Sequence, residues 1–190
     1  MIIASQLRNG MGVKFEGRNY KVMAVDYHPG QGKMGGVAHV RLKDLSTGTI
    51  WEHSFRAELK LESLVLEKQI LGFLYSDSEQ SYFMNPQTYD QLGISNSLIG
   101  PPVRFLRPDM QVTVEFLEDV PVSVIFPDIV EVQITDTAPA VHQQQDGTWK
   151  PARLENGVEV LVPQFIKNGD TIRLDVHSGK YMDRIRGGQK

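Results

Sequence analysis

The chain has 190 residues, 41% hydrophobic and 23% charged, so it can bury a core and has room for one large domain or two to three small ones. It has no cysteine, which excludes disulfides, thiolate zinc sites and a cysteine nucleophile. No apolar run reaches the ~18 residues of a membrane span, and the N-terminus does not resemble a signal peptide. We therefore expect a soluble cytoplasmic protein without a membrane partner.

The formal net charge of −3 is distributed unevenly. Residues 1–65 carry nine Lys or Arg against six Asp or Glu, residues 66–128 three against nine, and residues 129–190 eight against eight. An acidic middle between more basic ends is suited to phosphate contacts at the two ends. Ordinary solvated surfaces explain the same charges equally well.

Short alternating or β-branched runs, separated by turn residues, dominate the chain. They predict strands at residues 13–15, 20–25, 40–43, 49–55, 64–75, 81–84, 112–116, 122–126, 130–134, 158–162, 171–176 and 181–182. One short helix is predicted at 86–92, because Asn85 can cap it and Pro86 suits a first helical position. The pattern predicts an all-β chain of small barrels or sandwiches, not a doubly wound α/β sheet.

A hairpin with its turn recurs near residues 11–25, 109–126 and 169–184. Although generic hairpin composition could produce the same recurrence, it indicates three β-modules of about 60 residues each. The predicted domains are residues 1–65, 66–128 and 129–190.

Residues 28–37 join two predicted strands and are rich in glycine. Gly30, Gly32 and Gly35 formally match the G-x-G-x-x-G pattern, but a dinucleotide site needs a helix next, and the following residues alternate as a strand. Lys33 carries the only formal charge of this segment. The segment is either a passive exposed loop or a slim probe that delivers one ammonium group.

Sequence patterns of enzymes are sparse. The five histidines show no metal-ligand spacing, and no G-x-S-x-G motif is present, so we predict neither a metal site nor catalytic residues. Residues 150–170 predict a basic loop, a turn at Asn156-Gly157, a buried strand ended by Pro163, and a turn at Asn168-Gly169.

This last segment carries a specific resemblance. Eight positions match, at every spacing, the signature of bacterial elongation factor P: Lys150, Ala152, Gly157, Val160, Val162, Pro163, Ile166 and Gly169. Further matches run along the chain at residues 7–10, 43–48, 73–75, 82–84, 137–139, 169–170 and 179–184. The sequence therefore resembles the elongation factor P family over its whole length.

The resemblance implies an L-shaped monomer of three small β-barrel domains, an SH3-like (KOW-type) domain followed by two OB-folds. It implies a translation elongation factor, not an enzyme, that binds the ribosome beside the peptidyl-site tRNA and stimulates peptide-bond formation at consecutive prolines. The tip of the first domain would carry a Lys or Arg toward the peptidyl-transferase centre. That residue is often modified by a partner enzyme, and no cofactor is implied.

Three departures from the family pattern matter. The family commonly reads Pro-Gly-Lys-Gly at the tip, and alignment from Pro29 puts Gln31 at the lysine position, whereas alignment backwards from residues 43–45 favours Lys33. We choose Lys33, since a cation suits a phosphate-rich tunnel. Residues 140–147 replace the family's Gly-Asp-Thr loop, and His177 stands at a usual arginine position.

The site residues follow from this resemblance and from the charge distribution. Those that would support the tip are Pro29, Gly30, Gln31, Gly32, Met34 and Gly35. The candidate RNA contacts are Arg8, Lys14, Lys43, Lys150, Tyr181 and Arg184. Two other classes were weighed: a general single-strand nucleic-acid binder, disfavoured by 8% aromatic residues and an acidic middle, and a hydrolase, disfavoured by the missing motifs.

Overall fold

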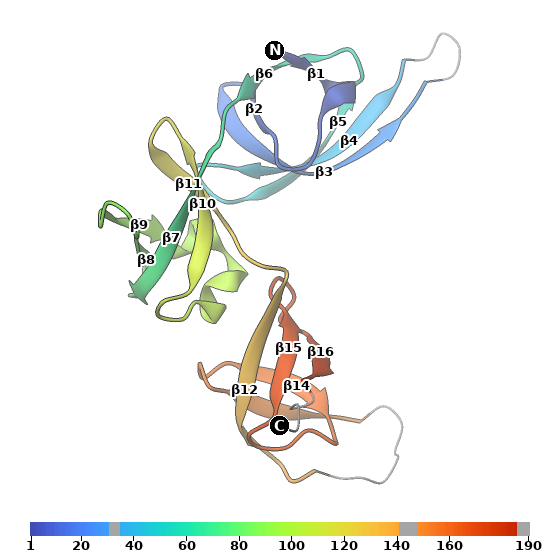
Figure 1. Cartoon of the computed structure of the whole chain (residues 1–190). Coiled ribbons are helices and arrows are strands. Elements are labelled where there is room, and N and C mark those ends of the chain that lie inside the picture. Colours follow the sequence, from blue (N-terminus) through green and yellow to red (C-terminus); the bar gives the residue numbers. More distant parts are fainter. Residues whose placement is uncertain (31–34, 141–147, 186–190) are drawn as a thin grey trace. The chain divides into compact units, whose positions relative to one another are not determined.

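The protein is built from three antiparallel sheets (Figure 1). The computed structural model describes residues 1–30, 35–140 and 148–185. In these residues sixteen strands form sheets of six, five and five strands, and helix is confined to α1 (Asn96–Ile99) and two 3-10 segments, η1 (Ala4–Gln6) and η2 (Pro101–Phe105). The predicted all-β fold is confirmed.

The chain divides into two compact units. The first consists of Met1–Gly100 and Gln111–Ile125 and holds the six-stranded sheet and one five-stranded sheet. The second consists of Pro101–Met110 and Phe126–Lys190 and holds the other five-stranded sheet. One sheet lies in each predicted module, whereas the boundaries near residues 65 and 128 stay predictions.

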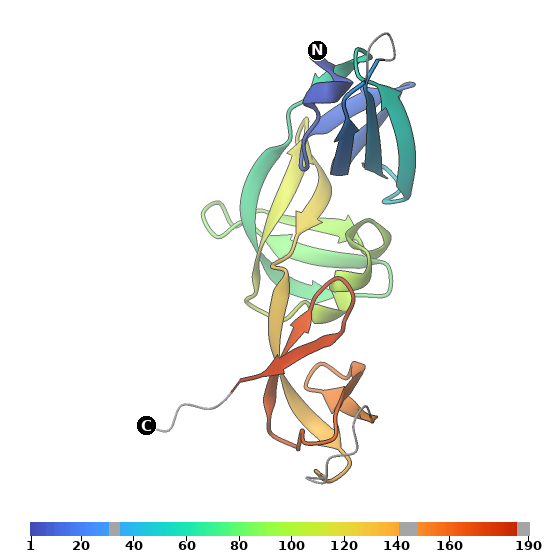
Figure 2. The same ribbon diagram turned by 90° about the vertical axis from the view of Figure 1, so that its right-hand side faces the viewer.

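The first sheet has the strand order β1-β6-β2-β3-β4-β5 and curls into an open barrel (Figures 1 and 2). Its strands are β1 (Ile2–Ile3), β2 (Gly12–Phe15), β3 (Arg18–His28), β4 (Val37–Asp44), β5 (Ile50–Arg56) and β6 (Lys60–Leu64). The hairpin is where the sequence predicts it, but its turn is the two residues Glu16 and Gly17, both at positive φ, and not the four residues 16–19, because Phe15 pairs directly with Arg18. Alternate residues of β4, among them Val40 and Leu42, are buried in the core.

The second sheet has the order β11-β10-β7-β8-β9. Its strands are β7 (Glu67–Ser76), β8 (Gln80–Met84), β9 (Gln91–Ser95), β10 (Gln111–Leu117) and β11 (Val120–Ile125). The run predicted at 64–75 joins the last residue of β6 to β7, but the chain leaves the first sheet at Leu64 and exposes Val65 before β7 begins.

The helix predicted at 86–92 is wrong. Asn85 does accept hydrogen bonds from the backbone N–H groups of Gln87 and Thr88, as a cap would, and Tyr89 N–H donates to the Asn85 carbonyl. The single turn stops there, because Tyr89 adopts φ +62° and the chain turns back into β9. The α-helix of this domain is α1, which the sequence analysis missed.

The third sheet has the order β14-β13-β12-β15-β16, from β12 (Ile129–Thr137), β13 (Trp149–Leu154), β14 (Glu159–Pro163), β15 (Thr171–Asp175) and β16 (Tyr181–Arg184). Counted within each domain, the second and third sheets share the strand order 3-2-1-4-5, and both match the five-stranded OB architecture. The basic loop predicted at the start of 150–170 is instead the strand β13, which lies between β12 and β14 with alternate residues buried.

Candidate functional site

The strands β3 and β4 flank the predicted tip segment in the sequence and form a long hairpin. The two strands pair from Tyr20 with Asp44 as far as His28 with Val37. Pairing of β3 with β2 covers only Arg18 to Lys21, so among the described residues the rest of β3 has β4 as its one partner strand. Figure 1 shows the hairpin extending away from the body of the barrel. Its described end comprises Pro29, Gly30 and Gly35, whereas four of the predicted tip residues, Gln31, Gly32, Lys33 and Met34, lie outside the described residues.

Gly36 allows the two strands to come together at this end. A Cβ added there would lie 2.7 Å from the hydroxyl oxygen of Tyr27 and 3.0 Å from the carbonyl oxygen of His28. A larger residue would therefore push the strands apart where the hairpin closes. Nearby, the His28 ring lies against His39, with centroids 5.3 Å apart.

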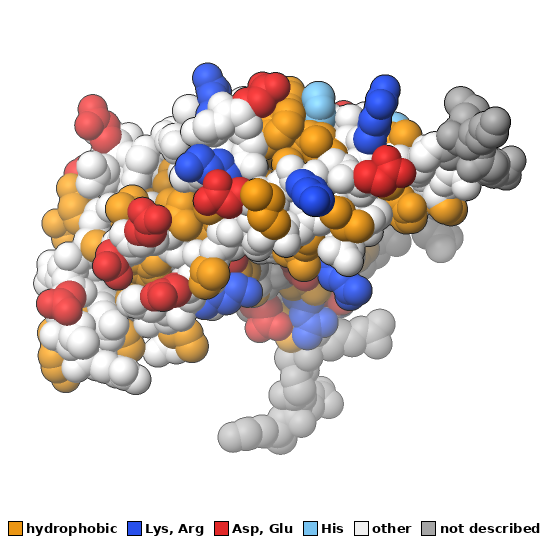
Figure 3. Space-filling view, turned by 90° about the horizontal axis from the view of Figure 1, so that it is seen from above, with side chains coloured by type: hydrophobic (Ala, Val, Ile, Leu, Met, Phe, Trp, Pro, Cys, Tyr) orange, Lys and Arg blue, Asp and Glu red, His pale blue; other side chains and the backbone are white. Residues whose placement is uncertain are grey.

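The candidate RNA contacts of the first domain differ in exposure. Arg8 and Lys14 are exposed, so their side chains are accessible to an RNA phosphate. Lys43 is half-buried, and its ammonium donates a hydrogen bond of 2.8 Å to the carbonyl oxygen of Leu98 in α1. Figure 3 shows that the basic side chains visible from above are separated by acidic ones, so this face carries no continuous basic patch.

The environment of Lys43 is electrostatically unusual. Burial lowers the pKa of Lys43 below its ordinary value, and the nearby charge of Lys21 lowers it further, while Glu115 acts in the opposite direction. Lys43 and Lys21 are cross-strand partners on β4 and β3. Two ammonium groups on neighbouring strands need a counter-charge, and one is present.

That counter-charge is Glu115, which sequence reasoning missed. Its Oε2 accepts a hydrogen bond of 2.5 Å from Lys21 Nζ, and the Glu115 side chain is fully buried on β10 of the second sheet. Its Oε1 has no hydrogen-bond partner in the described residues, and Lys68 Nζ lies 4.0 Å away. Counting charges along the sequence treats Glu115 as part of an acidic surface, whereas it joins the first sheet to the second.

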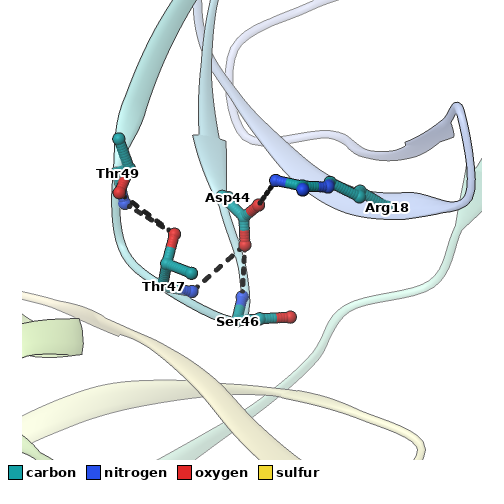
Figure 4. A network of polar contacts seen from close by, with 5 residues as sticks. All are labelled: Arg18, Asp44, Ser46, Thr47 and Thr49. Carbon is teal, nitrogen blue, oxygen red and sulfur yellow. Dashed lines mark hydrogen bonds and ion pairs between the residues drawn. The ribbon is translucent and has the colours of Figure 1, made fainter.

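The turn that follows Lys43 is held by Asp44 (Figure 4). Asp44 Oδ1 accepts hydrogen bonds from the N–H groups of Ser46, at 2.8 Å, and Thr47, at 3.1 Å. Its Oδ2 lies 3.7 Å from Arg18 Nη1, and the N–H of Thr49 donates to the Thr47 hydroxyl. The family-like segment 43–48 therefore fixes the turn between β4 and β5.

The predicted contacts of the third domain also differ in exposure. Lys150 is only 4% exposed, and its ammonium donates to the carbonyl oxygens of Ala138, at 2.5 Å, and Pro139, at 3.3 Å. This burial gives it a structural role and leaves no exposed charge for RNA. Tyr181 and Arg184 are partly exposed on β16, and Arg184 forms an ion pair of 3.5 Å with Asp170.

The described residues show neither a metal-binding cluster nor a membrane-spanning helix. Among the described residues, no three acidic or histidine side chains are grouped so as to hold a metal ion. Within the same ranges, none of the helices has the length and apolar character needed to span a membrane.

Comparison with known proteins agrees with this architecture. Sequence models described as Elongation factor P (EF-P) KOW-like domain, Elongation factor P (EF-P) OB domain and Elongation factor P, C-terminal match residues 3–61, 66–124 and 130–184. Elongation factor P of Clostridium kluyveri is 35% identical over 187 residues, covering 97% of this chain and all of that protein. The protein of the same name from Coprothermobacter proteolyticus is 36% identical over 186 residues, with the same coverage.

A more distant likeness involves a solved structure. Eukaryotic translation initiation factor 5A from Methanococcus jannaschii matches with a TM-score of 0.47 and 17% identity, over 65% of this chain and 92% of that chain. It is too distant to add to the assignment.

A KOW-like barrel followed by two OB-type domains, matched from end to end by these relatives, defines a translation factor. The chain belongs to the elongation factor P family. Members of this family are accessory factors of translation and not enzymes of the usual kind, and membership implies the ribosome as a partner.

Proposed function

We propose that this protein binds the ribosome beside the peptidyl-site tRNA and stimulates peptide-bond formation, relieving stalling at consecutive prolines. The observation that supports this most directly is the β3–β4 hairpin, which extends from the barrel and whose two strands precede and follow Lys33 in the sequence. In this proposal Lys33 is the cation at the tip, near the peptidyl-transferase centre. The supporting residues are Pro29, Gly30, Gln31, Gly32, Met34 and Gly35.

The mechanism we propose is positioning, not acid–base catalysis. Proline is a rigid donor and a poor acceptor, so misplacement of the reacting ends dominates its barrier. Holding the acceptor end of the tRNA in place recovers part of a positioning advantage that reaches about 7–11 kcal/mol in favourable cases. The protein then needs a rigid arm with one cation at its end, and no general acid or base.

The test is peptide-bond formation on a message that encodes three consecutive prolines. We expect Lys33→Ala to reduce the stimulated rate by roughly ten- to a hundredfold, the value of one charge-assisted hydrogen bond acting in the transition state. Thermal unfolding should be unchanged. Gln31→Ala is the matched control and should be much milder, since an amide cannot replace an ammonium; a severe Gln31→Ala with a normal Lys33→Ala would place the tip residue at Gln31.

A second experiment concerns the RNA contacts. Of the predicted cations of the first domain, Arg8 and Lys14 are exposed, so neutralising either should weaken ribosome binding and flatten its dependence on salt. Reversing an exposed acid of the second domain, Glu79→Lys, should have a smaller effect. Glu115 cannot serve as this control, because it is buried. If Glu79→Lys weakens binding as much as the loss of Arg8, the acidic middle is also in contact.

In the third domain we propose RNA contacts for Tyr181 and Arg184. The Asp170 carboxylate beside Arg184 would compete with phosphate, so Asp170→Asn should strengthen rather than weaken the interaction. We further propose that Lys33 is the target of a partner enzyme, that no cofactor takes part, and that the protein acts as a cytoplasmic monomer. Intact mass of the native protein, with peptide mapping across 29–35, tests the modification directly.

A further inference from the structure

The surface of the third domain contains a groove that the predicted site does not use. It has a volume of about 470 Å³, within the size range of sites that hold small organic groups. Its walls come from β13, β14, β16, the residues before β16 and η2, and include Trp149, Glu159, Leu161, Lys180, Tyr181 and Arg104.

Two large hydrophobic side chains of the groove are exposed to solvent. Trp149 is 50% exposed and Leu161 60% exposed, from neighbouring strands. The Tyr181 ring meets Trp149 nearly edge to face, with centroids 6.0 Å apart and planes at 74°. The two rings are therefore not stacked face to face, and half of Trp149 stays open to solvent, as a stacking platform requires.

The place of the groove in the fold is informative. In this sheet β13 and β14 are the second and third strands of an OB architecture, and Ser178, Gly179 and Lys180 belong to the connection between the fourth and fifth. OB-folds bind oligonucleotides on the face of strands two and three and on the loop between strands four and five. The aromatic pair therefore lies where this fold receives single strands.

The charges around the groove favour an anionic occupant. Among the described residues neither Arg104 nor Lys180 forms an ion pair, whereas the single acid, Glu159, is engaged by Arg153 at 3.3 Å. Arg104 is held against the backbone: a Cβ on Gly179 would lie 2.9 Å from the central guanidinium carbon. An apolar peptide would leave both cations unpaired, but a nucleotide brings its own phosphate.

We propose that this groove binds one unpaired nucleotide of a single-stranded RNA, with the base stacked on Trp149 and its phosphates facing Arg104 and Lys180. The choice of RNA over DNA rests on the proposed function; the stacking site itself does not. Every base has a π-face, so the groove selects for strandedness and not for sequence. Trp149 is new to the set of candidate contacts, whereas Tyr181 takes an additional role as the aromatic neighbour of Trp149.

The test uses the full chain with Trp51→Phe, so that Trp149 is the one remaining tryptophan, titrated with oligouridylate. We expect quenching of Trp149 fluorescence, weaker binding as salt rises, and at least tenfold weaker binding for the same RNA in a duplex. In the wild-type background, Trp149→Ala should weaken binding about 5- to 150-fold by anisotropy of labelled RNA, and Trp149→Phe should retain most of the affinity.

Met182→Ala is the matched control, because Met182 is also 50% exposed on β16 but does not line the groove. Any of three results would overturn the proposal: equal binding of duplex and single-stranded RNA, unchanged affinity of Trp149→Ala, or quenching of Trp149 fluorescence only by an apolar peptide. The peptide-bond assay on consecutive prolines separates this proposal from the proposed function. If oligouridylate does not bind but Lys33→Ala still reduces the stimulated rate, only the proposal for the groove is refuted.

Discussion

The buried pair of Lys21 and Glu115 should behave as one unit. Glu115→Leu leaves an ammonium that is only 10% exposed without its partner, beside the second ammonium of Lys43. Breaking a buried pair in this way costs about 3–5 kcal/mol of the free energy of unfolding, whereas replacing both partners by apolar groups is near neutral. We therefore expect a large loss for Glu115→Leu, a similar loss for Lys21→Met, and recovery in the double variant.

Lys68 does not change this expectation. Its ammonium lies 4.0 Å from Glu115 Oε1, but its side chain is 60% exposed, so it can compensate Glu115 only weakly when Lys21 is removed. The assay is urea unfolding followed by Trp51 fluorescence in a Trp149→Phe background, which reports on the first domain. Single variants that each lose less than about 1 kcal/mol, with additive effects in the double variant, would refute the reasoning.

Three further predictions concern neighbouring residues. Because the pKa of Lys43 is lowered in the folded protein, the unfolded chain binds this proton more tightly, so the free energy of unfolding rises with pH between the lowered value and 10.5. Urea unfolding at several alkaline pH values should therefore show the stability of wild type increasing relative to that of Lys43→Met as pH rises; a difference that does not depend on pH would contradict the lowered pKa. Asp44→Ala removes the acceptor of two turn N–H groups and should lower the free energy of unfolding by about 1–2 kcal/mol in the same assay. Glu52→Ala is the control: its carboxylate is 75% exposed in a surface ion pair, so the loss should be under about 0.5 kcal/mol, and equal losses would contradict the structural role of Asp44 in the turn. Lys150→Met leaves two carbonyl groups without a donor and should lower the free energy of unfolding by about 1–3 kcal/mol, measured through Trp149 fluorescence; an unchanged midpoint would mean that water replaces the ammonium.

The hairpins were predictable because their information is local. Glu118 and Asp119 both adopt positive φ and connect paired strands at Leu117 and Val120, as alternation on either side of two acidic turn residues predicts. The helix predicted at 86–92 failed for a local reason too: a good cap at Asn85 does not show that a left-handed residue four positions later, Tyr89, ends the turn.

The missed features are those that depend on distance in the sequence. Lys21 and Glu115 are 94 residues apart, and no pattern within either strand indicates that the other carries its counter-charge. Lys150 looks like an exposed cation until β13 is placed between two other strands, with Ala138 close by. The strand was not predicted because Pro151 lies inside it, and proline is rare within a sheet.

The long β3 strand also makes the first domain a mechanical lever. Lys21, near its base, and His28, at its far end, are seven residues apart, which at a rise of about 3.4 Å per residue is an arm of about 24 Å. A tilt of about 5° at the base therefore displaces the far end by about 2 Å, and a misplacement of 1 Å can cost about a hundredfold in rate where reacting groups must be aligned. Under the proposed function, a variant that folds normally but weakens the contact of Lys21 with Glu115 would therefore misplace the far end of the hairpin and lose stimulation of peptide-bond formation before it lost stability.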